Sequence, residues 1–310
     1  MASDTILLDV EASVATVPPR ARKRTSFVNG DRVSRGWMVV VTIVMVIAAA
    51  YFLIPVLWLV VASTKSTGDL FSTPGFAFAD PHFIENLVAL STYDDGIFWR
   101  WGLNSIIYSV IGSAFTTLVC ALTGYALAIY RFRGRNALIA VILASLLVPG
   151  TVIAQPTYVL LVGLGLNNTY AGLLLPALVY PFGVLLSFIY AQSAVPLELV
   201  EAARLDGAGE LRIFGSIGLR LMGTGLVTVL LFAFLGSWNS YILPLLVLND
   251  QELMPLTVGL TGWSQASITI PGLQILTVVG SLVSIIPVAI VFVSLQRFWR
   301  SGLTAGSVRG

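Results

Sequence analysis

The residues that could do chemistry gather in one short stretch, EAARLDG, at residues 201–207. It places two carboxylates, Glu201 and Asp206, and the guanidinium of Arg204 beside Ala202 and Ala203. A carboxylate next to small side chains on a helical turn suits a charge-assisted contact with a cationic partner, in the manner of a helix that enters a groove. The other interpretation is a connecting loop in which Glu201 pairs with Arg204, three residues on, for about 0.2–0.5 kcal/mol. The residues alone leave both interpretations open.

Patterns for catalysis or metal binding are missing from the rest of the sequence. The single histidine, His82, lies in an acidic segment without a clear set of further metal ligands, so we interpret it as an ordinary loop histidine. No G-x-x-x-x-G-K-[ST] loop is present to cradle nucleotide phosphates. The single cysteine, Cys120, lies in an apolar run and is expected to be a small buried hydrophobe. We therefore expect no enzyme activity, no metal and no cofactor in this chain.

The elements that position this stretch are predicted to be membrane helices. The chain has 310 residues, of which 57% are hydrophobic and 10% charged, and its mean hydropathy is +0.91. Soluble domains carry about 25% charged residues. Charge-free runs cover 36–64, 101–130, 136–197, 221–249 and 253–296. Since a spanning helix needs about 20 apolar residues, and Gly and Asn at 163–169 divide the longest run, we expect six helices, near 37–62, 102–130, 137–158, 169–192, 222–246 and 273–296.

The positions of the basic residues predict the orientation. With the N-terminus inside, 15 of the 17 Lys and Arg residues fall in cytoplasmic segments, and only Lys65 and Arg100 fall outside. The predicted topology is N-in and C-in, and the 201–207 stretch is cytoplasmic. No ionisable residue lies within a predicted span, which argues against a proton-driven carrier.

This topology divides the chain into segments. Residues 1–35 form a basic cytoplasmic tail without an apolar segment long enough for a signal peptide, so no cleaved leader is expected. A first transmembrane helix covers 36–62, an acidic extracytoplasmic loop 63–101, a five-helix core 102–296, and a C-terminal cytoplasmic tail 297–310.

Local signals predict a helix–turn–helix around the opening stretch. Pro196 suits a first helical position, and Glu198 falls in the first turn, where the helix dipole favours negative charge. Gly207 is a natural stop, and a second helix can begin near Gly209. The first helix is too short to be stable alone, so it must pack against something.

The stretch resembles the EAA loop of ABC importer permeases, whose pattern is E-A-A, three residues, G, nine residues, I-x-L-P. Glu201, Ala202, Ala203, Gly207, Ile217 and Leu219 match this pattern. Arg220 stands where the final proline is usual, which puts the start of the fifth span in doubt more than the docking. Much of the chain after its first 35 residues is similar to the smaller permease subunit of maltose-type carbohydrate importers, in motifs such as GYALAIYRFRGRN (124–136), SWNSYILPLLV (237–247) and QRFWRSGLTAGSVRG (296–310).

The resemblance implies an all-α membrane protein of the type I ABC importer permease fold, in a bacterial or archaeal cell membrane. The chain would pair with a second, homologous permease, and an ATPase dimer that binds ATP and Mg would dock on its loop 195–220. An extracytoplasmic binding protein would deliver a sugar. The helix with Glu201, Ala202, Ala203, Arg204, Asp206 and Gly207 would be the coupling helix. The tail residues Gly302, Leu303, Thr304, Ala305 and Gly306 would reach the interface of the ATPase dimer.

Polar residues within the predicted spans are candidates for the translocation pathway, with interhelical hydrogen bonding or an interfacial position as the alternative. They are Asn104, Gln155, Asn239, Tyr241 and Gln274. Other functions also stay open at this point: a stand-alone secondary carrier, a membrane scaffold or sensor that docks a signalling protein, and an ABC permease for another solute, such as a glycerol-phosphate compound.

Overall fold

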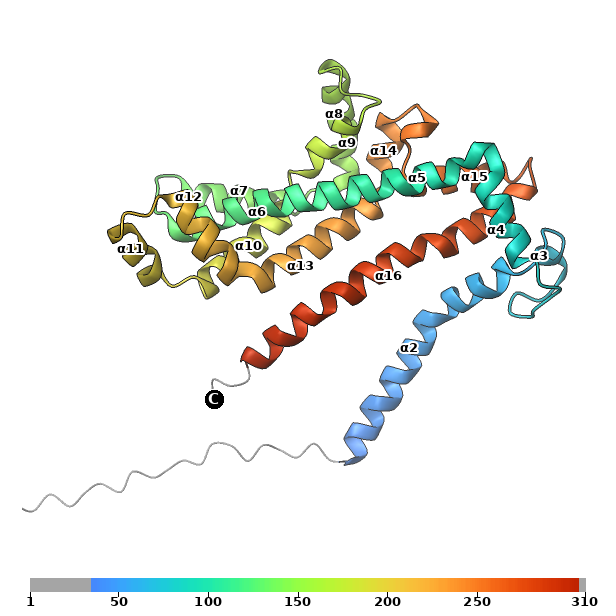
Figure 1. The fold of residues 1–310 in the computed structure, drawn as a ribbon, viewed down its shortest axis with the longest axis horizontal. Coiled ribbons are helices and arrows are strands. Elements are labelled where there is room, and N and C mark those ends of the chain that lie inside the picture. The colour runs from blue at the N-terminus through green and yellow to red at the C-terminus, as the bar shows by residue number, and fades with distance from the viewer. Residues whose placement is uncertain (1–34, 307–310) are drawn as a thin grey trace, which may run out of the picture. The chain divides into compact units, whose positions relative to one another are not determined.

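A computed structural model describes residues 35–306 of the chain, and within this range the chain is helical without a β-strand (Figure 1). The predicted basic tail therefore lies outside the described residues, except for Arg35, as do residues 307–310. The elements in chain order are α2 (Arg35–Ser63), α3 (Asp69–Ser72), α4 (Phe83–Thr92), η1 (Tyr93–Gly96), α5 (Ile97–Ile106), η2 (Ile107–Ile111), α6 (Gly112–Ile129), α7 (Arg135–Ser145), α8 (Gly150–Gly163), α9 (Tyr170–Ala177), α10 (Pro181–Ala194), α11 (Leu197–Leu205), α12 (Glu210–Ile213), η3 (Phe214–Gly218), α13 (Leu219–Trp238), α14 (Ile242–Val247), η4 (Gln251–Leu253), α15 (Leu256–Ala266) and α16 (Gly272–Gly306).

Four helical stretches of the described chain are long and apolar enough to cross a membrane. They are Gly36–Ser63, Phe83–Ile129, Glu210–Trp238 and Gly272–Gln296. Two bent pairs, α7 with α8 and α9 with α10, raise the number to six if each pair is one span. The all-helical membrane fold is thus confirmed, and the N-in, C-in orientation stays a prediction.

Five predicted boundaries differ from the structure. The predicted fourth span, 169–192, is divided into α9 and α10, which meet at 41°. The predicted third span, 137–158, is not one straight helix, because α7 and α8 meet at 105° around Pro149. The helical backbone conformation is disfavoured for the residue before a proline, so the helix that begins with α7 cannot continue through Pro149. The predicted fifth span, 222–246, ends at Trp238, and α14 is a separate short helix. The predicted loop 63–101 contains the helices α3 and α4. The last helix continues past 296 to Gly306.

The centre of the bundle is formed by α6, α10 and α13, which run side by side in Figure 1 and pack against one another. Glycines allow this close approach. A Cβ added at Gly124 of α6 would lie 2.5 Å from the Cβ of Ser187 on α10, and one at Gly225 of α13 would lie 2.2 Å from the ring of Tyr190. Small residues at helix crossings are the usual packing device within membranes. Cys120 is fully buried in this centre, as predicted.

A second set of contacts ties α5 to the segment that leads into α15. Trp101 Nε1 donates to the carbonyl oxygen of Gln251, and Tyr108 Oη donates to that of Leu253. Residues 101, 104, 105 and 108 share one helical face, and all four bind backbone groups of residues 251–256. This shared face of α5 and η2 therefore holds the connection between α14 and α15.

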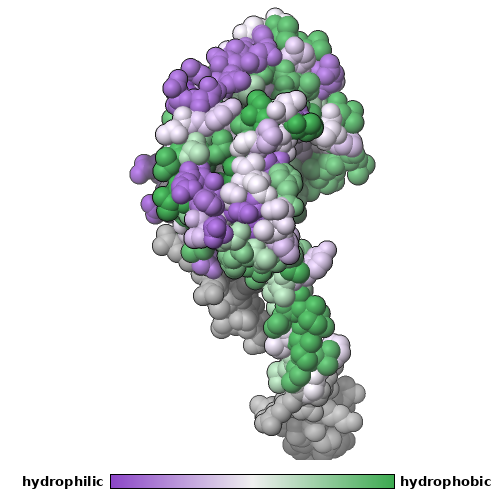
Figure 2. Space-filling view, turned by 90° about the vertical axis from the view of Figure 1, so that its right-hand side faces the viewer, coloured by the Kyte–Doolittle hydropathy of each residue, from purple (hydrophilic) through white to green (hydrophobic). Residues whose placement is uncertain are grey.

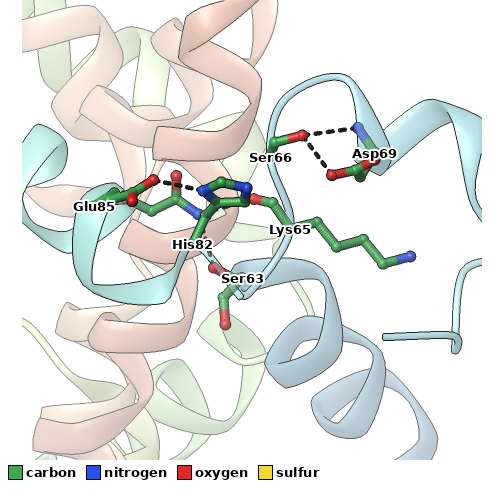
Figure 3. Close-up of polar contacts among 7 residues, drawn as sticks. Ser63, Lys65, Ser66, Asp69, His82 and Glu85 are labelled. Atoms are coloured by element: carbon green, nitrogen blue, oxygen red, sulfur yellow. Dashed lines mark hydrogen bonds and ion pairs between the residues drawn. The ribbon is translucent and has the colours of Figure 1, made fainter. Parts of the chain in front are cut away.

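The segment after α2 is fixed by side chains that bind backbone carbonyls (Figure 3). Asn86 Nδ2 donates to the carbonyl oxygens of Ser63 and Lys65, at 3.0 and 2.9 Å. The Lys65 side chain is buried, and its Nζ donates to Thr73 Oγ1 and to the carbonyl oxygen of Pro74. Figure 2 faces this end of the molecule and shows hydrophilic residues gathered over it.

His82 points toward Glu85 at the start of α4, and its Nδ1 lies 2.5 Å from Glu85 Oε2 (Figure 3). The hydrogen bond to Glu85 raises the pKa of His82 above its ordinary value. Within the described residues no group of three or more His, Cys, Asp or Glu side chains could hold a metal ion. The structure thus places His82 in an ordinary pair with a neighbouring carboxylate.

Candidate functional site

The EAARLDG stretch forms the end of α11, a short helix beyond the ends of α6 and α10, and the turn that follows it (Figure 1). Pro196 is extended, with φ −65° and ψ 132°, and precedes the helix rather than occupying its first position. Glu198 lies in the first turn and Arg204 in the last, so both charges complement the helix dipole. The sequence therefore favours a helix of these nine residues at this place.

A glycine turn ends α11. Gly207 has φ +79°, a left-handed conformation that favours glycine. The N–H of Gly207 donates to the carbonyl oxygen of Arg204, and the N–H of Ala208 donates to that of Ala203. This pair of hydrogen bonds is the Schellman motif, which satisfies carbonyls that a helix end otherwise leaves open. The predicted helix, glycine turn and second helix from Glu210 are all present.

Val200, together with partly buried Ala203, anchors α11 to the membrane bundle. Val200 is fully buried in a cluster that includes Tyr125 of α6, Ile213 of α12 and Met222 of α13. The opposite side of α11 is open, because Glu201 and Ala202 are exposed and Leu205 is 89% exposed. The helix is thus held along one edge and presents its acidic and small residues outward.

Arg204 pairs across the glycine turn and not within its own helix. Its Nε lies 2.7 Å from Glu210 Oε1, and its guanidinium carbon lies 5.6 Å from the ring centre of Tyr130. Tyr130 Oη donates to the second carboxylate oxygen of Glu210. The alternative pairing of Glu201 with Arg204 is therefore wrong, and in the described part of the chain Glu201 has neither an ion pair nor a side-chain hydrogen bond.

The electrostatics of this cluster follow from the same contacts. Two hydrogen bonds hold the pKa of Glu210 below its ordinary value, and the bond from Arg204 has a larger effect than the bond from Tyr130. Burial, as the larger effect, and the hydrogen bond to Glu210 raise the pKa of Tyr130 to about 12. The Glu210 carboxylate is thus charged at neutral pH and fixes Arg204, while Glu201 and Asp206 are exposed.

The chain returns to the membrane through α12, η3 and α13 without losing its helical path. η3 is a single π-helical turn, and Gly218 lies against the Tyr125 ring, where an added Cβ would come within 2.9 Å. Arg220, which replaces the proline usual in the resembled pattern, lies exposed in the first turn of α13. Unlike proline, it keeps the N–H that a helix interior needs. The start of this span is therefore intact despite the departure.

The predicted interface tail forms the end of α16, whose backbone is helical through Gly302, Leu303, Thr304, Ala305 and Gly306. The side chains of these five residues lie outside the part of the structure that is described. Their contact with an ATPase dimer stays a prediction.

Asn104 was proposed for the pathway on the basis of the sequence, and the structure buries it fully. Its Nδ2 donates to the carbonyl oxygens of Glu252 and Met254, and its Oδ1 accepts from Tyr170 Oη at 2.7 Å. Both amide hydrogens are thus engaged within the protein, and this arrangement is the interhelical alternative that the sequence left open.

The other four pathway candidates are dispersed. Asn239 ends α13 and donates to the carbonyl oxygen of Leu235, and Gln274 accepts from Ser267 Oγ. Tyr241 is half-buried before α14, and Gln155 is exposed on α8. A cavity of about 890 Å³ lies between α6, α8, α9, α10, α13 and α14, and none of the five candidates lines it. Its polar lining includes Ser105, Tyr108, Ser113 and Thr116. The structure does not bring the five candidates together, and their role stays a prediction.

Sequence reasoning missed Tyr130 and Glu210, which organise the turn. A signal for Glu210 was present, since an acidic residue at the start of a helix and six residues after an arginine can close a glycine turn from the far side. Tyr130 could not be found in this way, because it lies 80 residues from its partner.

Residues 121–301 match the model of a family described as "Binding-protein-dependent transport system inner membrane component". The matched segment contains α11, the glycine turn, the second half of α6, and all of α10 and α13.

Two relatives and one solved structure cover nearly the same length as this chain. An arabinooligosaccharides transport system permease protein of Halalkalibacterium halodurans is 34% identical, over 88% of this chain and 96% of the relative. A diacetylchitobiose uptake system permease protein of Streptomyces coelicolor is 30% identical, over 86% of this chain and 87% of the relative. A chain in the crystal structure of a bacterial ABC transporter involved in the import of the acidic polysaccharide alginate has a TM-score of 0.72 and 27% identity, and the match covers 86% of this chain and 97% of that one.

Proposed function

Because the chain belongs to the family of binding-protein-dependent transport system inner membrane components, we propose that it forms half of the translocation pathway of an ATP-driven carbohydrate importer. The chain is a multi-pass membrane permease subunit of an ABC importer. Substrate class, partners and docking residues, by contrast, are proposals, and each has its own support.

The observation that carries the docking proposal is the state of Glu201. A carboxylate without a partner, on a helix whose own arginine is held by Glu210, is available to a basic residue of another protein. Exposed Ala202 and Leu205 beside it offer small and apolar surface for the same contact. The partner is an ATPase subunit, and α11 is the coupling helix.

Val200 gives the docked helix a mechanical connection to the bundle. It shares one buried cluster with Tyr125 of α6 and with Ile213 and Met222 of the continuous helical stretch from α12 to α13, so α11 shares a core with two helices of the bundle. A rigid-body movement of the ATPase would therefore move α6 and α13 together, as in the switching of transporters between two openings. Gly207 and its capping bonds keep α11 at a fixed angle during this movement.

The remaining partners follow from the family. A second homologous permease supplies the other half of the pathway, and an extracytoplasmic binding protein delivers the substrate. Two ATPase subunits bind ATP and Mg and carry out the hydrolysis, so this chain contributes no catalytic residue. The end of α16 extends the ATPase contact through residues 302–306.

A carbohydrate substrate is supported by the relatives, whose names specify arabinooligosaccharides and diacetylchitobiose, and by the alginate importer among solved structures. The hydroxyls of Tyr108, Ser113 and Thr116 line the central cavity, and since each donates its hydrogen to a backbone carbonyl, their oxygens could accept hydrogen bonds from the hydroxyls of a sugar.

The test is to purify the tagged chain from its own membranes in mild detergent and to identify the proteins that accompany it by mass spectrometry. A second permease, a P-loop ATPase and a binding protein are expected, and the ligand of that binding protein identifies the substrate. A phosphate ester as its ligand would refute the carbohydrate proposal and leave the importer intact. Purification of the chain alone, from membranes whose transport responds to an ionophore and not to ATP, would refute the importer proposal in favour of a secondary carrier.

A further inference from the structure

A second cavity lies at the same end of the bundle as α11. It has a volume of about 650 Å³ and is formed by the end of α6, the turn at 130–134, the start of α7 and the link from α10 to α11. Neither the docking contact nor the translocation pathway uses it. Two of its lining residues, Val195 and Leu197, belong to the segment that positions the coupling helix.

The polar lining of this cavity suits an anion. Arg131 and Arg135 both line it, together with Asn136 and Gln192, and no carboxylate is among the described residues around it. Nε of Arg135 donates to the carbonyl oxygen of Leu127 and its guanidinium lies over the Phe188 ring, which fixes the position of this charge.

The start of α7 adds to the same preference. A helix leaves its first N–H groups without partners in the helix, and Asn136 and Ala137 in the first turn of α7 line the cavity, whereas the N–H of Arg135 donates to the carbonyl oxygen of Phe132. The helix dipole disfavours the positive charge of Arg135 at this end. An anion in the cavity would accept hydrogen bonds from the open N–H groups and would also offset this unfavourable charge. Arg131 and the held Arg135 provide the charge independently of the helix end.

The position of the cavity favours a lipid over a free ion. It lies at the ends of three candidate spans that the basic residues predict to be cytoplasmic, since α6 ends at Ile129, α7 begins at Arg135 and α10 ends at Ala194. Apolar residues complete its lining, among them Ala128, Ile129 and Phe132, of which Phe132 is 47% exposed. A basic cavity between membrane helices at the cytoplasmic side is a typical site for an anionic lipid headgroup.

We propose that this cavity binds the phosphate of an anionic phospholipid, with Arg131 and Arg135 as its cationic ligands. The headgroup contacts Val195 and Leu197 and so steadies the start of α11. This last consequence rests on the proposed function, whereas the binding of the lipid does not.

The experiment compares two arginines of one turn. Arg133 is exposed like Arg131 and carries the same charge, but it does not line the cavity. The intact importer is purified as wild type, Arg131→Gln and Arg133→Gln, and bound phosphatidylglycerol and phosphatidylcholine are counted by native mass spectrometry. Wild type and Arg133→Gln should retain phosphatidylglycerol selectively, and Arg131→Gln should bind it about fivefold more weakly. Equal loss in both variants would refute a defined site and indicate only a general attraction of basic residues to anionic lipid.

A second measurement does not depend on the stability of the arginine variants. A Gln192→Cys substitution places a thiol in the lining of the cavity, and Cys120 is buried, so a maleimide should label only the new position. Labelling in nanodiscs should be several times slower with phosphatidylglycerol than with phosphatidylcholine alone. Equal labelling rates in the two membranes would overturn the proposal. Equal protection by inorganic phosphate added to phosphatidylcholine nanodiscs would overturn the assignment to a lipid.

Discussion

The Arg204 guanidinium is bound to the Glu210 carboxylate across the Gly207 turn, with Nε 2.7 Å from Oε1. The contact closes the turn between α11 and α12 and removes the one basic group of α11 that could neutralise Glu201. The internal ion pair and the outward carboxylate are therefore two aspects of one arrangement. The pair shapes the loop, and Glu201 is left for another protein.

Replacement of Glu201 should separate docking from folding. Glu201→Gln keeps the size of the side chain and removes its charge, so the charge-assisted contact with the ATPase is lost. We expect ATP-dependent uptake and co-purification of the ATPase to fall at least tenfold, with unchanged amounts of the chain in the membrane. Glu198→Gln, in the first turn of the same helix, is the matched control and should keep most of the activity. Full uptake by Glu201→Gln would contradict the role of this residue.

Alanine at two nearby glycines should have opposite outcomes. Gly207 has φ +79° and Gly209 has φ −70°, and neither would bring a Cβ within 4 Å of another atom. Gly207→Ala should therefore cost about 1–2 kcal/mol through backbone strain alone, and Gly209→Ala very little. Hydrogen exchange of the amide of Ala208, which caps α11, should accelerate roughly tenfold in the first variant only. Equal exchange in the two variants would show that the capped turn does not control the loop.

The Arg204–Glu210 pair predicts a response to acid. Since the pKa of Glu210 lies below its ordinary value, the pair stabilises the folded loop at pH values above the unfolded-state pKa, about 4.3. This stabilisation is lost as the pH falls through the lower pKa of the folded state. Proteolysis of the loop at 205–210 by pepsin should thus increase at acid pH more in the wild type than in Glu210→Gln, which lacks the titrating group. Parallel pH profiles for the two proteins would exclude a contribution from the pair.

The titration of His82 reports on the start of α4, because His82 is the single histidine of the chain. The hydrogen bond to Glu85 raises its pKa, so the pair stabilises this segment below the unfolded-state pKa of about 6.5 and is lost as the pH rises through the higher folded-state value. In Glu85→Gln the NMR signal of His82 should titrate at a lower pH than in the wild type. An unchanged midpoint would contradict the observed pairing.

Two of the pathway candidates, Asn104 and Gln155, should contribute differently to the stability of the fold. Asn104 is fully buried, and Asn104→Ala leaves the carbonyl of Met254 and the hydroxyl of Tyr170 without this partner. A loss of about 1–3 kcal/mol is expected, seen as a lower melting temperature in detergent. Exposed Gln155 is the control, and Gln155→Ala should leave the melting temperature unchanged. A stable Asn104→Ala protein with impaired uptake would restore the pathway role of this residue.

The sequence predicts the parts of the fold that depend on local chemistry. The break between α8 and α9 was expected at 163–169, and there Gly165 and Asn168 both have positive φ. The glycine turn at 207 was likewise readable, because a left-handed residue is needed after α11. These positions are specified by the residue itself and not by its neighbours in space.

Other features depend on tertiary contacts or on signals that charge counting ignores. The bend at Pro149 was missed because a charge-free run shows how long an apolar segment is, and not whether its helix changes direction. Helix α4 was missed because its charged and polar residues made the segment read as a loop, although Leu90 and Asn86 are buried in the packed structure. The pairing of Tyr130 with Glu210 needs α6 and α12 to meet, which no local pattern encodes.

The most direct test of docking through α11 is site-specific cross-linking. A single Ala202→Cys substitution adds an exposed thiol beside Glu201, and Cys120 is fully buried and so does not compete. Intact membranes are labelled with a short linker that carries a maleimide at one end, for the new thiol, and a photoreactive diazirine at the other, which inserts into any neighbouring protein. Irradiation followed by mass spectrometry should identify a P-loop ATPase as the cross-linked protein, and nucleotide should change the yield. A product that contains only a second copy of this chain, or no protein product in membranes active for ATP-dependent uptake, would contradict the assignment of α11 as the coupling helix.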